Sequence, residues 1–224
     1  MKYIIANLKA HQNLTEANTW INVFVNKLRN NLDIRAALKS GTLEVILAPS
    51  APFLMLFKTS THEFPNMKIA AQDISMFEKG SYTGEAGSHA LAGLVDYAIV
   101  GHSERRSNLN ETDDIVRKKV ESSMNHAIAP VICVRTPEEA QGYGQEMIAF
   151  EPPDAIGSGS NYPVESVIEF KNKLELPQAA PFLYGGSVDE TNVHSYLEHD
   201  EIAGALVGTA CRDASRFCEL LAAV

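Results

Sequence analysis

The chain has 224 residues, of which 45% are apolar and 21% are charged. This length and composition suit one large hydrophobic core and exclude a disordered or fibrous chain. The 19 basic and 28 acidic side chains leave a formal net charge of −9, which repels phosphate backbones, so no nucleic acid is expected as a partner.

The cysteines and the apolar stretches bear on the compartment. Cys133, Cys211 and Cys218 are odd in number and form no CxxC pair, which favours reduced thiols over a disulfide framework or a zinc site. The apolar stretch at residues 1–6 is shorter than the hydrophobic region of a signal peptide, and no other window approaches about 20 apolar residues. A cytoplasmic protein that does not associate with a membrane is therefore expected.

Short apolar runs alternate with longer amphipathic segments along the whole chain. The runs predict eight strands, at residues 3–7, 43–49, 67–72, 95–101, 129–134, 147–151, 182–185 and 203–208. The segments between and after them predict helices at residues 15–32, 51–58, 85–94, 111–127, 136–143, 164–174, 189–198 and 213–223. Thr112 is expected to cap the helix after it, and Asp189 is expected to begin the next-to-last helix.

This alternation predicts a parallel sheet covered by helices, because a parallel strand returns through a crossover rather than a hairpin. Eight units of this kind fit an α/β fold of the closed (β/α)8 type, the TIM barrel, in a single domain over residues 1–224. Alternation alone leaves an open, doubly wound sheet as the alternative.

In such a barrel, chemistry belongs at the carboxyl ends of the strands. Polar or glycine-rich segments follow five of the predicted strands, at residues 7–9, 101–106, 151–160, 184–188 and 207–209. They offer the Glu151 carboxylate, the His102 imidazole, the Lys9 ammonium and glycine turns that suit a phosphate. This set suits proton transfer next to a carbonyl and requires no metal and no cofactor.

Four motifs carry a more specific resemblance. They are Asn7-x-Lys9, GHSERR at residues 101–106, Glu151-Pro152 followed by a glycine-rich stretch, and YGGSV at residues 184–188. Their order and context resemble the triosephosphate isomerase family over essentially the whole chain. The resemblance implies interconversion of D-glyceraldehyde 3-phosphate and dihydroxyacetone phosphate through an enediolate, in glycolysis and gluconeogenesis.

The resemblance also implies roles for individual residues. Glu151 would be the base, His102 the electrophile, Lys9 the electrostatic stabiliser and Asn7 a positioning group. Backbone N–H groups of Gly157, Ser187, Gly208 and Thr209 would bind the phosphate. Ser103, Glu104 and Tyr184 would support the site, and residues 152–162 would form a lid.

Self-association is implied as well. The loop at residues 77–85 resembles the one that enters a neighbouring subunit in this family, with Thr83 reaching toward the partner's Asn7 and His102 and Glu85 facing Arg105. A homodimer is expected, with a tetramer as the alternative.

The chain departs from the common family pattern in the lid hinge and in the phosphate turn, among other places. Pro152-Pro153-Asp154 replaces a Pro-aliphatic-Trp hinge and is similar to the hinge of short archaeal forms. Thr209 stands where glycine is frequent, but a residue with negative φ can still offer its N–H.

Two other functions remain open. Another phosphate-binding barrel isomerase or lyase would share the glycine turns, and a non-catalytic barrel would share the fold. The other isomerase or lyase is not expected to combine Asn7, Lys9, His102 and Glu151, whereas the non-catalytic barrel would have a damaged lid.

Overall fold

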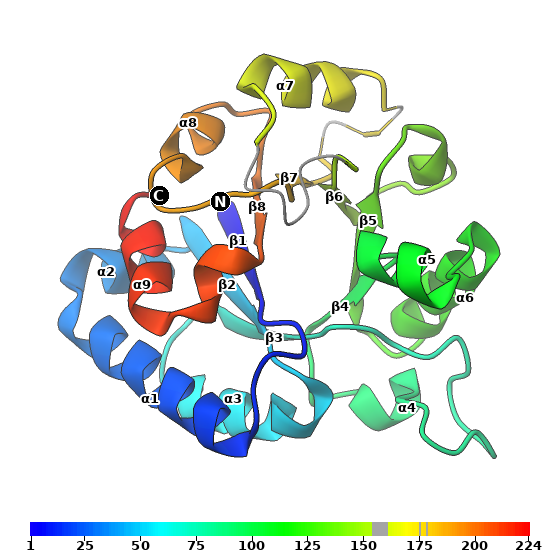
Figure 1. The fold of residues 1–224 in the computed structure, drawn as a ribbon, viewed down its shortest axis with the longest axis horizontal. Helices are drawn as coiled ribbons and strands as arrows, with labels where there is room; N and C mark the ends of the chain where they lie inside the picture. The colour runs from blue at the N-terminus through cyan, green and yellow to red at the C-terminus, as the bar shows by residue number, and fades with distance from the viewer. Residues whose placement is uncertain (154–160, 175, 178) are drawn as a thin grey trace.

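The computed structural model describes residues 1–153, 161–174, 176–177 and 179–224. Eight parallel strands close into a barrel in sequence order, and helices surround it (Figure 1). The strands are β1 Lys2–Asn7, β2 Leu43–Ala48, β3 Met67–Ala71, β4 Tyr97–Val100, β5 Ala129–Val134, β6 Met147–Phe150, β7 Phe182–Tyr184 and β8 Gly204–Val207. Pairing of β8 with β1 completes the ring, so the (β/α)8 prediction is confirmed and the open sheet is excluded.

The helices of the described chain are α1 Leu14–Asn30, α2 Leu32–Ser40, α3 Leu54–Thr61, α4 Ser88–Leu91, α5 Ser103–Leu109, α6 Asp113–Met124, α7 Val164–Asn172, α8 Val193–Leu197 and α9 Ala214–Ala222. Three short 3-10 helices accompany them, η1 Ala51–Phe53, η2 Glu138–Ala140 and η3 Thr209–Arg212. Among these described helices, none is long and apolar enough to cross a membrane.

Local hydrogen bonds explain where the helices differ from the sequence predictions. Asn31 ends α1 and caps α2 through its side chain, so a second helix follows where only one was predicted. Thr112 caps α6 as expected, through a bond from the Ile115 N–H. The side chain of Asp189 instead accepts the N–H and O–H of Thr191, which holds a turn, and α8 begins only at Val193.

Two further predictions were wrong in extent. The segment at residues 136–143 forms only the short η2, because few residues connect β5 to β6. The segment at residues 85–94 is helical only over α4. In contrast, α5 begins within the GHSERR motif and extends to Leu109, where no helix was predicted.

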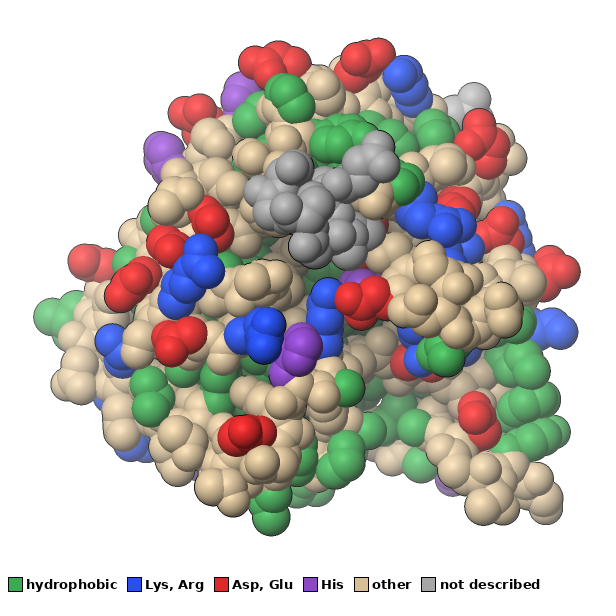
Figure 2. Space-filling view, viewed as in Figure 1, with side chains coloured by type: hydrophobic (Ala, Val, Ile, Leu, Met, Phe, Trp, Pro, Cys, Tyr) green, Lys and Arg blue, Asp and Glu red, His purple; other side chains and the backbone are tan. Residues whose placement is uncertain are grey.

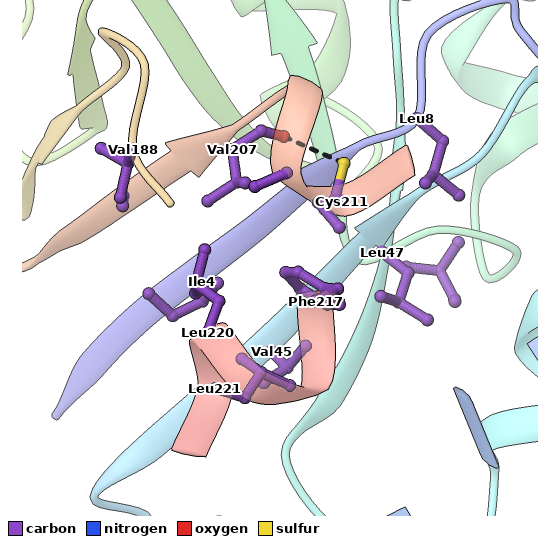
Figure 3. Close-up of a cluster of buried hydrophobic side chains, with 14 of the residues drawn as sticks. Ile4, Leu8, Val45, Leu47, Val188, Val207, Cys211, Phe217, Leu220 and Leu221 are labelled. Carbon is purple, nitrogen blue, oxygen red and sulfur yellow. Dashed lines mark hydrogen bonds between the residues drawn. The ribbon is translucent and has the colours of Figure 1, made fainter. Parts of the chain in front are cut away.

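The core has two layers that follow the two-residue period of the strands. Ile5, Ile46 and Ile99 belong to the cluster inside the barrel. Ile4 belongs to the outer layer between strands and helices. Figure 3 shows part of this outer layer, where α9 packs over β1 and β2. The barrel interior is therefore filled with side chains, and the strand ends remain for chemistry.

An aromatic cluster fixes the last helix to the first. Phe217 of α9 is fully buried, with its ring centroid 5.6 Å from that of Phe24 and 6.2 Å from that of Trp20. Trp20 also donates its indole N–H to the carbonyl of Cys211 at 2.9 Å. These contacts secure η3, the short helix that follows β8, against α1.

Candidate active site

The end of β1 supplies an amide and an ammonium. Asn7 is the last residue of β1 and is buried. Lys9 has a φ of +51°, a left-handed conformation that costs roughly 1–3 kcal/mol in a residue other than glycine. Its N–H donates to Asn7 Oδ1 at 3.2 Å, and its carbonyl accepts from Ser50 Oγ at 2.8 Å and Gln72 Nε2 at 2.9 Å. These three bonds hold Lys9 in that conformation.

The Lys9 ammonium reaches across to the segment that follows β4. Its Nζ lies 2.5 Å from Glu104 Oε1, in a partly exposed ion pair. Burial alone would raise the pKa of Glu104, but the hydrogen bond and charge of Lys9 outweigh it, and the pKa is lowered. Glu104 therefore keeps its negative charge and orients the ammonium.

His102 occupies the N-cap position of α5 and is buried. Its Nδ1 accepts the backbone N–H of Glu104 at 3.2 Å, which places a ring proton on Nε2 in the neutral form. That Nε2 lies 2.9 Å from Glu151 Oε1. The imidazole is thus fixed at both nitrogens.

Glu151 follows β6 and is only 2% exposed. Its second oxygen, Oε2, accepts the N–H of Ser103 at 2.8 Å. Ser103 is the first residue of α5, where the positive end of the helix dipole favours a carboxylate. A buried carboxylate is therefore stabilised between an imidazole and a helix N-terminus.

Burial opposes charge on His102, but the nearby carboxylates act in the other direction. The charge and hydrogen bond of Glu151, together with the charge of Glu104, outweigh burial and raise the pKa of His102 above its ordinary value. The contact between His102 and Glu151 thus ties the protonation of the two groups together.

Cys133 lies beside this pair without sharing its chemistry. It is fully buried, and burial and the negative charge of Glu151 raise the pKa of its thiol well above the ordinary value. The thiol stays neutral and packs in the cluster inside the barrel. Cys211 in η3 and Cys218 in α9 are also free and buried.

Two turns after β7 and β8 face the same cavity. Ser187 and Gly208 line it together with Thr209, the first residue of η3. The cavity is also lined by Asn7, Lys9, His102 and Glu151. The fold therefore brings together the described members of the predicted catalytic and phosphate-binding sets, whereas Gly157 lies outside the described residues.

Tyr184 lies below this cavity and is completely buried. Its hydroxyl accepts the N–H of Tyr162 at 2.7 Å. Tyr196 of α8 donates its hydroxyl to the Tyr162 carbonyl at 2.5 Å, so Tyr162 is held on both sides of its backbone. The segment predicted as a lid, residues 152–162, lies largely outside the described residues, but Tyr162 at its end is firmly attached.

A groove of about 660 Å³ opens beside the catalytic cavity. Asn7, Lys9 and His102 line one part of it, and the predicted interface residues Glu85 and Arg105 line another. Thr83 is exposed on the loop at residues 77–85, whose Phe77 and Tyr82 rings stack with centroids 3.8 Å apart.

Arg105 belongs to a partly buried ionic network that sequence reasoning missed. Its guanidinium bonds Asp73 at 2.8 Å and Glu111 at 2.6 Å, and Lys119 bonds Asp73 at 2.7 Å. Ser50 and Gln72, which hold the Lys9 carbonyl, were also missed as site residues. The pairing of Asp73 and Glu111 with Arg105 and Lys119 depends on tertiary contacts, which no local sequence pattern shows.

Within the described residues, no group of three or more His, Cys, Asp or Glu side chains is arranged to hold a metal ion. The arrangement that is present combines a buried carboxylate, an imidazole, an ammonium and two turns that line the same cavity.

Comparison with known proteins agrees with this arrangement. Residues 2–224 match the family model described as triosephosphate isomerase. The chain is 31% identical over 241 residues to a protein of Mycoplasmopsis pulmonis with that name, with 97% of this chain and 96% of that protein aligned. It is 32% identical over 249 residues to a protein of the same name from Mesomycoplasma hyorhinis, with 97% of this chain and 96% of that protein aligned. A third protein of this name, from Dehalococcoides mccartyi, is 31% identical over 248 residues, with 97% of this chain and 94% of that protein aligned.

Proposed function

This chain belongs to the triosephosphate isomerase family, and we propose that Asn7, Lys9, His102 and Glu151 carry out the reaction of that family in it. The reaction interconverts D-glyceraldehyde 3-phosphate and dihydroxyacetone phosphate, and the chain is an aldose–ketose isomerase of glycolysis. The observation that carries the proposal is the 2.9 Å contact between Glu151 Oε1 and His102 Nε2 in a buried cavity.

Glu151 removes a proton from the carbon next to the substrate carbonyl, and the electrons of that C–H bond pass to the carbonyl oxygen to form the enediolate. The His102 Nε2–H donates to the oxygens and moves protons between them. Lys9 stabilises the developing negative charge, and Asn7 orients Lys9 through the bond to its N–H. Glu151 then returns a proton to the neighbouring carbon, which completes the isomerisation without net gain or loss of atoms.

Substrate must separate Glu151 from His102 in this scheme, since both point at the same reacting atoms. The separation weakens the contribution of Glu151, the larger of the two carboxylate contributions that raise the pKa of His102. The Glu104 N–H that Nδ1 accepts then favours the neutral imidazole. Triosephosphate isomerase is itself the reference example of a neutral histidine at a helix N-terminus, and these contacts are in keeping with it.

The phosphate is assigned to the N–H groups of Ser187, Gly208 and Thr209, with Gly157 as the fourth member implied by the resemblance. The position of Thr209 at the start of η3 supports this assignment. Thr209 is not among the residues with positive φ, so its β-carbon is no obstacle to offering the N–H.

Residues 152–162 remain our proposal for the lid, with a hinge of the Pro-Pro-acidic type. The two prolines, Pro152 and Pro153, fix φ at one end of the segment. At the other end, Tyr184 and Tyr196 hold Tyr162.

A homodimer is proposed for the assembly, with the loop at residues 77–85 inserted into the groove of the partner. Exposed Thr83 and Glu85 on this loop support the proposal, as does a groove that reaches Lys9 and His102. We place the protein in the cytoplasm, in keeping with its three free cysteines.

The test is turnover of D-glyceraldehyde 3-phosphate in a coupled assay, with a chelator present. Run in D₂O, the reaction should give product with deuterium on carbon, because Glu151 exchanges its proton with solvent between the two transfers. Product free of deuterium would contradict proton transfer by an exchanging base and would indicate a direct hydride shift.

A further inference from the structure

Arg212 is a cation that the proposed reaction does not use. It is the last residue of η3 and is exposed, and it makes no hydrogen bond or ion pair with any residue that the structure describes. Side chains three residues apart eclipse each other on a 3-10 helix, so Arg212 follows Thr209 on the same side of η3. Thr209 lines the catalytic cavity.

His11 is a second exposed residue close in sequence to a cavity residue. It lies two residues after Lys9, in the link between β1 and α1, and is exposed. His11 and Arg212 line one pocket of about 460 Å³ beside the start of α9. The catalytic cavity and this outer pocket are therefore bordered by the same two segments of chain.

Two carboxylates also line the outer pocket, but both are engaged in capping. Glu16 accepts the N–H of Asn13 at 2.8 Å. Asp213 accepts the N–H groups of Ser215 and Arg216 at 2.8 and 2.9 Å. Their negative charge is directed to backbone donors, whereas the Arg212 guanidinium has no such partner.

Lys9, His11 and Arg212 act electrostatically on neighbouring residues of the same region. Burial raises the pKa of the Cys211 thiol to about 12, and both Lys9 and Arg212 oppose that rise. Lys9 and His11 both act electrostatically to lower the pKa of Glu104. Figure 2 shows Lys or Arg and His side chains gathered beside a carboxylate near the centre of the face in view.

We propose that Arg212, assisted by His11, attracts the substrate and captures its phosphate group before the group enters the catalytic cavity. This inference rests on the proposed function. A phosphate monoester carries a charge of about −1.5 to −2 at pH 7, and the chain as a whole has a charge of −9 that repels it. A cationic path beside the cavity offsets that repulsion and raises the rate of productive encounter.

The test is the ionic-strength dependence of kcat/KM for Arg212→Gln. We expect a loss of about threefold at 10 mM ionic strength that shrinks to less than about 1.5-fold at 0.5 M, with kcat changed much less than kcat/KM. Arg212→Lys should keep most of the wild-type kcat/KM at 10 mM ionic strength, because it keeps the positive charge. His11→Asn combined with Arg212→Gln should deepen it.

Lys39→Gln is the matched control. Lys39 is exposed in the last turn of α2, just before the cap that leads into the amino end of β2, and its loss changes the net charge equally. Equal effects of Arg212→Gln and Lys39→Gln at all salt concentrations would overturn the proposal. A loss in Arg212→Gln that persists at 0.5 M would also overturn it. Failure of the proposed function is a separate outcome, recognised by an inactive wild type.

Discussion

Glu151 and His102 meet through a 2.9 Å contact between Oε1 and Nε2, although one follows strand β6 and the other follows strand β4. The α5 N-terminus serves both, because Ser103 N–H binds Glu151 and Glu104 N–H binds His102. One short helix therefore orients the carboxylate and the imidazole together.

The first prediction concerns the pH profile. The proposed reaction needs a proton-accepting carboxylate and a neutral His102, and the nearby carboxylates raise the pKa of His102. Loss of kcat/KM on the acid side should therefore begin at a higher pH than for an ordinary imidazole. Glu104→Gln removes one of these carboxylates, so its acid limb should move to lower pH. An unchanged limb in a pH–rate measurement would contradict this account.

Lys9→Met should damage both binding and turnover. The change removes an ammonium that lines the cavity and leaves Glu104 without its 2.5 Å partner. We expect kcat/KM to fall by about 10²–10³-fold, as for other losses of a transition-state donor. Steady-state kinetics at low ionic strength provide the measurement. A specificity constant equal to that of the wild type would make Lys9 a surface residue without a catalytic role.

The assembly prediction is a mass of about twice 24.5 kDa by light scattering at micromolar concentration. Thr83→Arg should lower that mass, because Thr83 is exposed in the chain and the new charge would enter a partner groove that already holds Lys9. A fully active wild-type species of 24.5 kDa would contradict the proposed dimer.

Phe217→Ala should destabilise the fold without touching the site directly. Phe217 is fully buried between α9 and α1, and removing a buried aromatic ring costs about 3–5 kcal/mol of unfolding free energy. Leu32→Ala, at a side chain that is 73% exposed, is the control and should change stability far less. Urea unfolding of both variants checks the difference, and equal midpoints would show that the aromatic cluster contributes little.

The barrel and its strand-end residues could be predicted from the sequence because both depend on local pattern. Buried strands appear as apolar runs, and polar residues directly after them must reach the same rim. For this reason Asn7, Lys9, His102 and Glu151 could be named before the fold was known, and the fold brings them to one cavity.

Helix boundaries and supporting contacts were less predictable, because they depend on single hydrogen bonds or on distant partners. Whether Asn31 caps a second helix is decided by its bond from Ile34 N–H. The left-handed conformation of Lys9 depends on Ser50 and Gln72, which belong to other parts of the chain. The pairing of Arg105 with Asp73 and Glu111 likewise exists only in the folded barrel.

The most direct test of the account is the turnover number of Glu151→Gln. The substitution keeps the size of the side chain but removes the proton acceptor, so kcat should fall by at least about 10³-fold while the circular dichroism spectrum stays that of the wild type. A folded Glu151→Gln variant with kcat within tenfold of the wild type would contradict the assignment of Glu151 as the base.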